Sequence, residues 1–490
     1  MSNTIVKDYL PVDTSRPVAE FLCVDLDGTI LNGDLLWESL LVLLGAHPWY
    51  IFLIPLWLMR GRAYLKHEIA RRVALNVSTL PFHEDVIGYL REEKRRGRKL
   101  ILATGSDETL ATAVADYLGF FDFVLGSDGK TNLTGENKRR KIKDTLGDKE
   151  FDYAGNSAVD LPIWDAAQTA ILVGPSPRLL KTLHRTQSVG GVFEIRKWQW
   201  SSLAKALRPL HWAKNLLVFV PLVMAHEFTN KEKVAQAILA FASFSLCASG
   251  VYVLNDLFDL EADRLHPIKR TRAFASGELP LWMGLLLSPM LLAAGIAIGA
   301  GVSRLFFATM VIYAAATTLY SVYGKREPIV DVLLLTGLYL LRILGGGVAT
   351  NVPVSPWLLA FSMFFLLSQA FAKRQAELIG SAADETGQAA PSKRNYITRD
   401  IDLVQQFGVT SGYLSVLVLA LYINGREVTS LYHHPQLIWL ACPLLLFWIS
   451  RLWFITNRGQ MNEDPVVFAT RDPVSYLVGL VMLLILFAAS

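Results

Sequence analysis

Residues 21–30 read FLCVDLDGTI, an apolar run that ends in two aspartates and a glycine. The run has the composition of a buried strand, and side chains two positions apart point to the same side of a strand. Asp25 and Asp27 are therefore expected to lie side by side where the strand ends, and Gly28 and Thr29 to turn the chain. Two convergent carboxylates with Mg²⁺ suit phosphoryl transfer, because one can attack phosphorus while the other protonates the leaving alcohol.

Four further strand-like runs follow before about residue 190, separated by stretches of helical character. This alternation predicts an α/β domain with a parallel sheet. The runs are KLILATG (99–105), FDFVLG (121–126), FDYAG (151–155) and TAILVG (169–174).

Residues 35–59 are apolar and long enough to cross a membrane once. We reject a crossing, because it would separate Asp25 from later residues of the same site, and because Glu38 and Pro48 interrupt the stretch. We expect instead an apolar cap, about residues 35–90, that lies in the membrane interface with Trp and Tyr side chains as anchors. The alternative is a soluble helical hairpin buried against the sheet.

Apolar stretches of about the length that a bilayer requires recur after residue 207, which predicts an all-α polytopic membrane domain of nine transmembrane helices. Lys and Arg concentrate in alternate connections, and cytoplasmic loops retain such residues. The first domain and the polar motifs are therefore placed on the cytoplasmic side of the inner membrane. The stretches lie near 214–228, 234–254, 281–302, 304–323, 329–349, 354–372, 408–424, 435–455 and 473–489.

The composition of the 490 residues is typical of a membrane protein, since 52% of them are hydrophobic. The formal net charge of +4 is too small to indicate a nucleic-acid partner, and none is expected. The three cysteines lie far apart in apolar stretches, which argues against a disulfide framework or a zinc site. No apolar signal peptide is recognised at the amino terminus, so the first domain is expected to stay in the cytoplasm.

A second polar stretch, residues 255–277, follows the second predicted span and reads NDLFDLEADRLHPIKRTRAFASG. On one helix, Asp256, Asp259 and Asp263 would share a face, because positions i, i+3 and i+7 recur on one side. Three carboxylates so close repel one another unless a cation joins them, and Mg²⁺ prefers oxygen ligands and bridges readily to a diphosphate. The basic residues that follow supply partners for phosphate groups. The alternative is a solvated charged loop, but acidic residues beside a span are costly unless they are functional.

The amino-terminal pattern resembles the haloacid dehalogenase (HAD) phosphatase superfamily, whose later motifs occur here in order. The resemblance implies a Rossmann-type domain that binds Mg²⁺ through Asp25, Asp27 and two later side chains. Asn156 stands where many relatives have the first of two late aspartates, and an amide can ligate magnesium but carries no charge. An alternative interpretation is a phosphatase fold retained as a scaffold. The later motif residues are Thr104 as the phosphate-binding hydroxyl, Lys138 as the charge-stabilising lysine, and Asn156 and Asp160 as metal ligands.

The acidic stretch and the spans resemble the UbiA superfamily of intramembrane prenyltransferases, over about residues 205–490. Aromatic prenyltransferases of that superfamily usually add a second aspartate pair of the form DxxxD, but Leu335 stands four residues after Asp331. The details are similar to one branch, the decaprenyl-phosphate phosphoribosyltransferases, which transfer 5-phosphoribose from phosphoribosyl diphosphate to a polyprenyl phosphate. Such relatives often have proline where Ala273 follows Arg272. The similar segments are RPLHWAKN (208–215), DRLHPIKRTR (263–272), YLLRILGGG (339–347) and AKRQAEL (372–378).

The two resemblances together imply two reactions in one chain. Mg²⁺ on Asp256, Asp259 and Asp263 would hold the leaving diphosphate while the acceptor phosphate displaces it at the anomeric carbon. The HAD-like domain would then remove the 5-phosphate and leave polyprenyl phosphoribose. The expected bounds are 1–190 for the phosphatase domain, 191–207 for a linker and 208–490 for the transferase domain. The residues expected to bind substrate are Lys214, Asn255, Arg264, His266, Lys269, Arg272, Lys325, Asp331, Tyr339, Arg342, Lys373 and Arg374.

Two other functions stay open at this point. One is a prenyltransferase that moves a polyprenyl group from its diphosphate to an aromatic acceptor, and the other is a non-catalytic lipid-binding scaffold or carrier. The incomplete second aspartate pair and the basic residues around it favour the sugar-phosphate donor. The intact aspartates argue against the scaffold.

Overall fold

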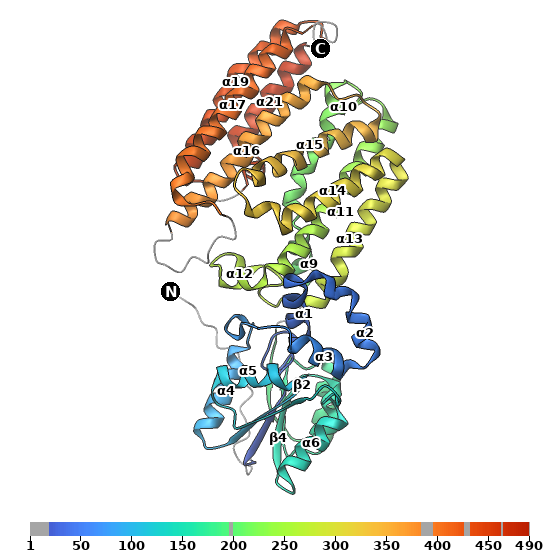
Figure 1. Cartoon of the computed structure of the whole chain (residues 1–490), viewed down its shortest axis with the longest axis vertical. Coiled ribbons are helices and arrows are strands. Elements are labelled where there is room, and N and C mark those ends of the chain that lie inside the picture. The colour runs from blue at the N-terminus through green and yellow to red at the C-terminus, as the bar shows by residue number, and fades with distance from the viewer. Residues whose placement is uncertain (1–18, 196–198, 384–394, 426–431, 462–463, 490) are drawn as a thin grey trace. The chain divides into compact units, whose positions relative to one another are not determined.

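The computed structural model describes residues 19–195, 199–383, 395–425, 432–461 and 464–489 (Figure 1). Contacts within the chain divide it into two units. The first unit comprises Met1–Leu203 together with Asp256–Leu285, and the second comprises Ala204–Asn255 together with Leu286–Ser490. The acidic stretch, which its motif assigns to the transferase half, therefore packs with the amino-terminal unit.

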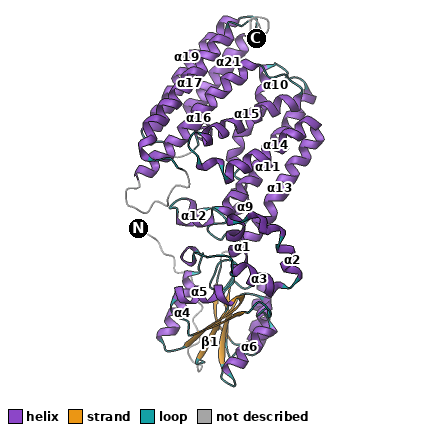
Figure 2. Cartoon of the chain, in the orientation of Figure 1, coloured by secondary structure: helices purple, strands orange, loops and turns teal. Residues whose placement is uncertain are grey.

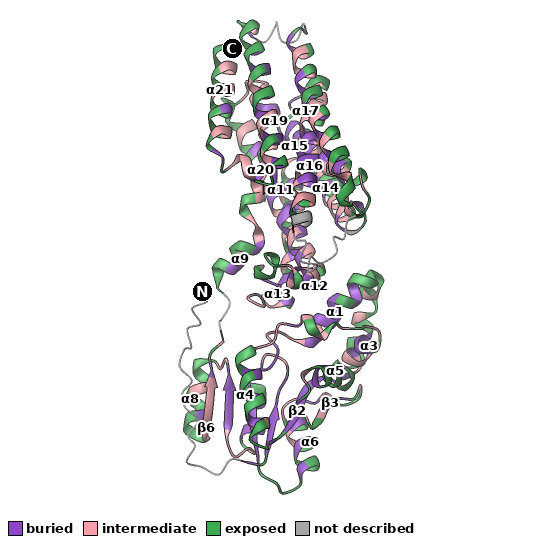
Figure 3. Cartoon of the chain, turned by 90° about the vertical axis from the view of Figure 1, so that its left-hand side faces the viewer, coloured by how far each residue is buried: buried purple, intermediate pink, exposed green. Residues whose placement is uncertain are grey.

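The first unit is built on a six-stranded parallel sheet of order β3-β2-β1-β4-β5-β6. All five strands predicted from the sequence are confirmed. The sixth strand, β6, was missed, because two glycines weaken its strand signal and most of it is only half-buried at the sheet edge (Figure 3). The predicted linker 191–207 holds the end of β6 and the helix α9 (Trp200–Leu207). The strands are β1 (Phe21–Val24), β2 (Lys99–Asp107), β3 (Phe123–Ser127), β4 (Phe151–Gly155), β5 (Ala170–Val173) and β6 (Val189–Phe193).

Helices cover both faces of this sheet, because alternate strand residues are apolar on each side. Leu22 and Val24 of β1 pack with α4 and α5 in one core, whereas Cys23 packs with α6, α7 and α8 in the other. The helices are α4 (Glu84–Arg95), α5 (Glu108–Leu118), α6 (Glu136–Leu146), η3 (Ala158–Asp160), α7 (Leu161–Trp164) and α8 (Pro177–Thr186).

A helical cap follows β1, and it contains the stretch that could have been interpreted as a tenth span. The structure divides this stretch at His47, so no single helix crosses the length of a bilayer there. Trp49, Phe52 and Met59 are 60%, 78% and 84% exposed, which leaves one apolar surface uncovered. The cap comprises α1 (Leu35–Ala46), η1 (Pro48–Phe52), α2 (Ile54–Met59), α3 (Arg62–Ala70) and η2 (Val77–Thr79).

In its described residues the second unit contains helices joined by loops and turns, and no strand (Figure 2). Each of the nine predicted spans coincides with helical residues. In the described part of the chain, however, the number of helices that are long and apolar enough to cross a membrane is six. Shorter apolar helices cover two of the other stretches, Pro209–Met224 and Pro473–Ala489. The prediction of nine transmembrane helices is thus supported only as a multi-helix membrane domain.

Glycines permit close packing of the helices; for example, a Cβ at Gly346 of α15 would lie 2.0 Å from the backbone oxygen of Val218. The elements α12, η5 and the start of α13 fall within Asp256–Leu285 and so belong to the first unit. The elements from residue 209 onward are η4 (Pro209–Phe219), α10 (Val220–Met224), α11 (Lys231–Phe258), α12 (Leu260–Leu265), η5 (Lys269–Thr271), α13 (Leu281–Val302), α14 (Arg304–Val322), η6 (Gly324–Arg326), α15 (Val330–Thr350), α16 (Pro356–Ala383), η7 (Thr398–Asp400), α17 (Ile401–Ile423), η8 (Pro435–Leu440), α19 (Ala441–Asn457), α20 (Pro465–Ala469) and α21 (Pro473–Ala489).

Candidate active sites

The amino-terminal site lies at the carboxyl end of β1, between β2 and β4. The backbone N–H of Asp25 continues the sheet by donating to the carbonyl oxygen of Ala154 at 2.9 Å. Lys138 of α6 donates to Asp25 Oδ1 at 2.8 Å, and its Nζ lies 3.6 Å from Asp160 Oδ1. Tyr153 accepts a hydrogen bond from Lys138 and donates one to Asp160. The structure therefore brings together three residues that the HAD motifs predicted from separate segments, namely Asp25, Lys138 and Asp160.

Asp27 and Thr104 complete this site. Ser106 donates to Asp27 Oδ2 at 2.6 Å, and the hydroxyl oxygen of the fully buried Thr104 accepts from the backbone N–H of Ser106 at 3.0 Å. Burial raises the pKa of Asp27 to about 6. A buried carboxyl group with a pKa nearer neutrality can both give and take a proton, which suits an acid/base residue. Burial also raises the pKa of Asp25 to about 7, although Lys138 favours the ionised form.

The donor set beside Asp25 fits a magnesium ion. A Cβ at Gly28 would lie 1.9 Å from the side-chain nitrogen of Asn156, so this amide rests directly on the turn that follows Asp27. The side chains of Asp25, Asn156 and Asp160 offer oxygen atoms, the ligands that Mg²⁺ prefers. Within the described residues no group of three or more His, Cys, Asp or Glu side chains is arranged to hold a metal ion, so an amide or backbone oxygen would have to complete the set.

Four residues near this site were not singled out from the sequence: Asp34, Lys66, Ser106 and Tyr153. Lys66 extends from cap helix α3 and donates to the carbonyl oxygen of Gly105 at 2.6 Å, next to the predicted phosphate-binding Thr104. Ser106 follows Thr104 closely and could have been found from that spacing. The contact made by Lys66 joins residues 39 positions apart, and no local pattern signals it.

The acidic stretch does not form the single helix that its spacing predicted. The helix α11 ends at Phe258, Asp259 stands at the break, and α12 carries Asp263, so the prediction of one continuous face is wrong. Like charges on one helix face destabilise a helix, which disfavours a continuous helix through this stretch. Asp256 and Asp263 nevertheless converge, because one guanidinium nitrogen of Arg272 lies 3.2 Å from Asp256 Oδ1 and 2.6 Å from Asp263 Oδ2.

This convergence shows that the two buried carboxylates are arranged around one cation. Asp256 and Asp263 therefore fit a shared divalent ion, with Arg272 as the cation between them in this structure. Arg272 was predicted to bind substrate, and its partners here are the aspartates themselves. Asp259 stands between them at the helix break and is half-buried.

The other predicted ligands in this stretch have different neighbours. Arg264 forms two hydrogen bonds with Glu38, at 3.0 and 2.6 Å. His266 Nδ1 accepts from the backbone N–H groups of Ile268 and Lys269, which shapes the loop, and the Lys269 side chain is exposed. In the second unit, Asn255 donates to Ser321 at 3.1 Å.

A group of three cations lies in the second unit: Lys214 and Arg342 are buried, and Lys373 is half-buried. Lys214 of η4 and Lys373 of α16 both contact the same oxygen, Asp464 Oδ2, at 2.7 and 3.1 Å. Lys214 and Arg342 both lie over the ring of Tyr339, at 5.8 and 5.5 Å from its centroid. The structure therefore gathers four of the predicted substrate-binding residues around one carboxylate that sequence reasoning had missed. Asp464 lies in a loop of the predicted inward side, and that position is the signal that could have identified it.

Arg342 is held by neutral groups. Among the described residues, it donates to Asn215 Oδ1 at 2.7 Å, to the hydroxyl of Tyr313 at 2.7 Å and to the carbonyl oxygen of Leu338 at 2.6 Å. These partners fix the orientation of the Arg342 guanidinium group but do not neutralise its positive charge. Asn215 and Tyr313 are further residues that sequence reasoning did not place in the site.

Asp331 and Arg374 form a separate buried pair. Arg374 also contacts Glu377 and donates to the hydroxyl of Tyr320 at 3.0 Å, and Tyr396 donates to Asp331 Oδ1 at 2.8 Å. These two predicted ligands therefore bind each other. Lys325 lies on η6 and is half-buried.

Comparison with known proteins identifies the family. Residues 216–471 match the UbiA prenyltransferase family, and the chain belongs to this family. It is 33% identical over 466 residues to the protein y4nM of Sinorhizobium fredii, which covers 94% of this chain and 89% of that protein. It is also 31% identical over 280 residues to the decaprenyl-phosphate phosphoribosyltransferase of Mycolicibacterium smegmatis, which covers 56% of this chain and 87% of that enzyme. The chain is thus a multi-pass membrane protein of a transferase family, and the predicted resemblance is confirmed.

Solved structures resemble each part of the chain at low identity. A UbiA homolog from Archaeoglobus fulgidus bound to GPP and Mg²⁺ has a TM-score of 0.44 and 19% identity, covering 58% of this chain and 96% of that one. A substrate-bound phosphoserine phosphatase has a TM-score of 0.26 and 16% identity, covering 37% of this chain and 95% of that one. These scores are too low to support an argument, so the assignment depends on the family match and the motifs.

Proposed function

We propose that this protein transfers 5-phosphoribose from phosphoribosyl diphosphate to a polyprenyl phosphate, and that its HAD-like domain then removes the 5-phosphate. The observation that carries the transferase proposal is the group of Lys214, Lys373 and Arg342, whose positive charge exceeds the negative charge of Asp464. Buried charge inside a membrane domain is costly unless it serves a ligand, and a phosphate group is the ligand that such an excess favours. The similarity to decaprenyl-phosphate phosphoribosyltransferases supports the same donor and acceptor.

In the transferase reaction, an oxygen of the polyprenyl phosphate attacks the anomeric carbon of the ribose, and the bond from that carbon to diphosphate breaks. The acceptor is already ionised near neutral pH, so no strong base is required. Asp256 and Asp263, with Asp259 beside them, would hold Mg²⁺, which neutralises the charge of the leaving diphosphate. Lys214, Lys373 and Arg342 hold and orient the phosphate groups of the substrates.

In the phosphatase reaction, Asp25 attacks phosphorus and the bond to the ribose 5-oxygen breaks. Asp27 gives its proton to the leaving oxygen and then removes a proton from the water that releases phosphate from Asp25. Thr104 and Lys138 bind the phosphate oxygens. Asp25, Asn156 and Asp160 would hold the Mg²⁺ of this site.

The competing reaction, transfer of a prenyl group to an aromatic acceptor, receives less support. Asp331 would belong to the second aspartate pair of such enzymes, but it is paired with Arg374 and Tyr396. We further propose that both sites lie on the cytoplasmic side of the inner membrane, because Lys and Arg concentrate in the connections on that side.

The direct test is to incubate the purified chain and Mg²⁺ with radiolabelled phosphoribosyl diphosphate and polyprenyl phosphate, and to analyse the extracted lipid by mass. A lipid that carries ribose without its 5-phosphate is expected. Label that stays in the aqueous phase, while a prenyl diphosphate and an aromatic acceptor react, would reject the proposal in favour of the competitor. The Asp256→Asn variant is the control, because label that enters the lipid through the transferase site should be lost in it.

A further inference from the structure

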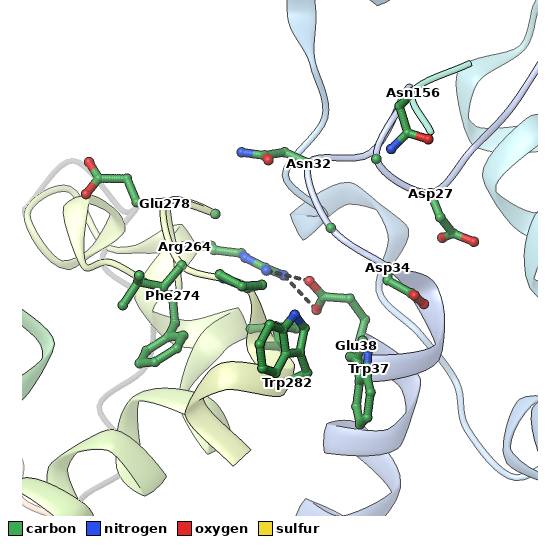
Figure 4. A pocket seen from close by; sticks show the side chains of 16 residues that line it. Asp27, Asn32, Asp34, Trp37, Glu38, Asn156, Arg264, Phe274, Glu278 and Trp282 are labelled. Atoms are coloured by element: carbon green, nitrogen blue, oxygen red, sulfur yellow. Dashed lines mark hydrogen bonds and ion pairs between the residues drawn. The ribbon is translucent and has the colours of Figure 1, made fainter. Parts of the chain in front are cut away.

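A cavity of about 410 Å³ lies beside Asp27 in the first unit. One part of its lining comes from the loop after β1, from α1 and from Asn156. The other part comes from the stretch between Arg264 and Trp282 (Figure 4). The phosphatase site therefore shares a cavity with a stretch that belongs, by sequence, to the transferase half.

The two parts of the lining are firmly joined. Figure 4 shows the paired hydrogen bonds between Glu38 and Arg264, which link residues 226 positions apart. Arg264 also donates to the carbonyl oxygen of Ala275 at 3.2 Å, which fixes the loop behind it. Gly277 has a φ of +74°, and a Cβ there would lie 2.5 Å from the side-chain nitrogen of Asn32. The second stretch is therefore packed in direct contact with the phosphatase loop.

The charges of the lining are unequal. Four of the lining residues carry a carboxylate, and Arg264, the cation among them, is already bound to that of Glu38. The Glu278 carboxylate points away from the other lining side chains in Figure 4 and accepts a hydrogen bond from Ser202 at 2.7 Å. Such a lining accepts hydrogen bonds from hydroxyl groups and repels a second anionic group on the same ligand. The carboxylates are those of Asp27, Asp34, Glu38 and Glu278.

Aromatic side chains lie beside these carboxylates. Trp37 and Trp282 lie near Glu38 in Figure 4, Phe274 lines the same cavity, and Trp282 is 44% exposed. A pocket of flat apolar surfaces with a few fixed acceptors suits a ligand that has hydroxyl groups at its edges and carbon-bound hydrogens on its faces. A sugar or another polyol has this character.

We propose that this cavity holds the alcohol part of the phosphatase substrate, and that the stretch from Arg264 to Trp282 determines its specificity for phosphate monoesters of neutral polyols. The ester phosphate lies at Asp25, and the polyol lies between the tryptophan rings and the carboxylate of Asp34. This inference rests on the proposed phosphatase activity. A lipid-linked sugar phosphate and a free one share this chemistry.

The test uses the full chain in lipid nanodiscs and measures phosphate release from ribose 5-phosphate, from 3-phosphoglycerate, whose alcohol part carries a carboxylate, and from acetyl phosphate, whose small group carries neither hydroxyl nor charge. The wild type is expected to prefer ribose 5-phosphate over 3-phosphoglycerate by about tenfold or more in kcat/KM. Trp282→Ala should raise KM for ribose 5-phosphate about tenfold and change kcat less than about twofold, because it removes a contact that stabilises the bound substrate and the transition state equally. Acetyl phosphate hydrolysis should be unchanged. The matched control is Trp357→Ala, since Trp357 is 40% exposed at the start of α16 and lies outside the cavity.

A second variant, Asp34→Asn, keeps the test decisive if Trp282→Ala does not fold. It should lower KM for 3-phosphoglycerate about threefold, because it removes one repelling charge. A preference for 3-phosphoglycerate, or equal losses on ribose 5-phosphate and acetyl phosphate in Trp282→Ala, would overturn the inference.

Two further comparisons separate the possible sources of failure and of substrate. If the wild type releases no more phosphate than Asp25→Asn from any of the three compounds, the phosphatase proposal fails and the inference falls with it. Lipid extracts from the coupled transferase assay identify the source. If Trp282→Ala accumulates the 5-phosphorylated lipid, the cavity binds the lipid-linked sugar, whereas an effect confined to added ribose 5-phosphate assigns it to the free sugar.

Discussion

Replacing Arg264 with methionine should loosen the stretch Leu260–Leu281. The Arg264 and Glu38 side chains are 9% and 5% exposed, and two hydrogen bonds join them. Arg264→Met leaves the Glu38 carboxylate buried without its cation, and breaking a buried pair in this way costs about 3–5 kcal/mol. Since about 1.4 kcal/mol corresponds to a factor of ten, the lower bound is about a hundredfold increase in the local opening equilibrium.

Hydrogen exchange followed by mass spectrometry on the full chain measures this opening directly, in peptides that cover α12 and the following loop. The double variant Glu38→Leu/Arg264→Met should return to within about tenfold of the wild type, because apolar groups replace a buried pair at little cost. Lys94→Met is the control, since its pair with Asp122 is about one-third exposed on each side and contributes little. A double variant that exchanges as fast as Arg264→Met, or an Arg264→Met variant that matches the control, would refute the reasoning.

Three further outcomes are expected. Asp25→Asn should accumulate the 5-phosphorylated lipid in the coupled assay, because transfer continues while the nucleophile is missing; a normal yield of dephosphorylated lipid would contradict this. Asp256→Asn should lower label transfer by about a hundredfold, because it removes a carboxylate from the diphosphate site, and should leave acetyl phosphate hydrolysis intact. A polarity-sensitive dye on Phe52→Cys should report an apolar environment in liposomes, whereas the same dye on Tyr117→Cys, an exposed position of α5 that is 54% accessible, should report water. Equal dye spectra at the two positions would favour the soluble cap.

The parts of the fold that sequence predicted well are those set by local patterns. The strands of the amino-terminal sheet are short apolar runs between helices, and parallel pairing then brings their carboxyl ends to one edge. This edge explains how Asp25 and Thr104 come close together, whereas Thr104 and Lys138, the latter on α6, were assigned to the site through the resemblance to the HAD superfamily. The helix break at Asp259 could not be predicted in this way. Helical spacing tells which residues share a face only as long as the helix is continuous.

Ion pairing over long sequence distances accounts for most of what sequence reasoning missed. Lys214 and Asp464 are 250 positions apart, and Glu38 and Arg264 are 226 apart. No local periodicity relates such residues, since their contact follows from how the helices pack. A basic residue beside a membrane span was therefore interpreted as a ligand for phosphate, although its first partner is a carboxylate of the same chain.

This pairing changes how substrate recognition should be understood. Arg264, Arg272 and Arg374 each have a carboxylate partner within the chain, so an incoming phosphate must compete with that partner. The lysines of the second unit differ, because two of them share the single carboxylate of Asp464. Arg342 adds a third positive charge, and its partners are neutral oxygen atoms. A phosphate binds where positive charge is left over, and in the second unit this excess lies around Tyr339, not at the paired arginines.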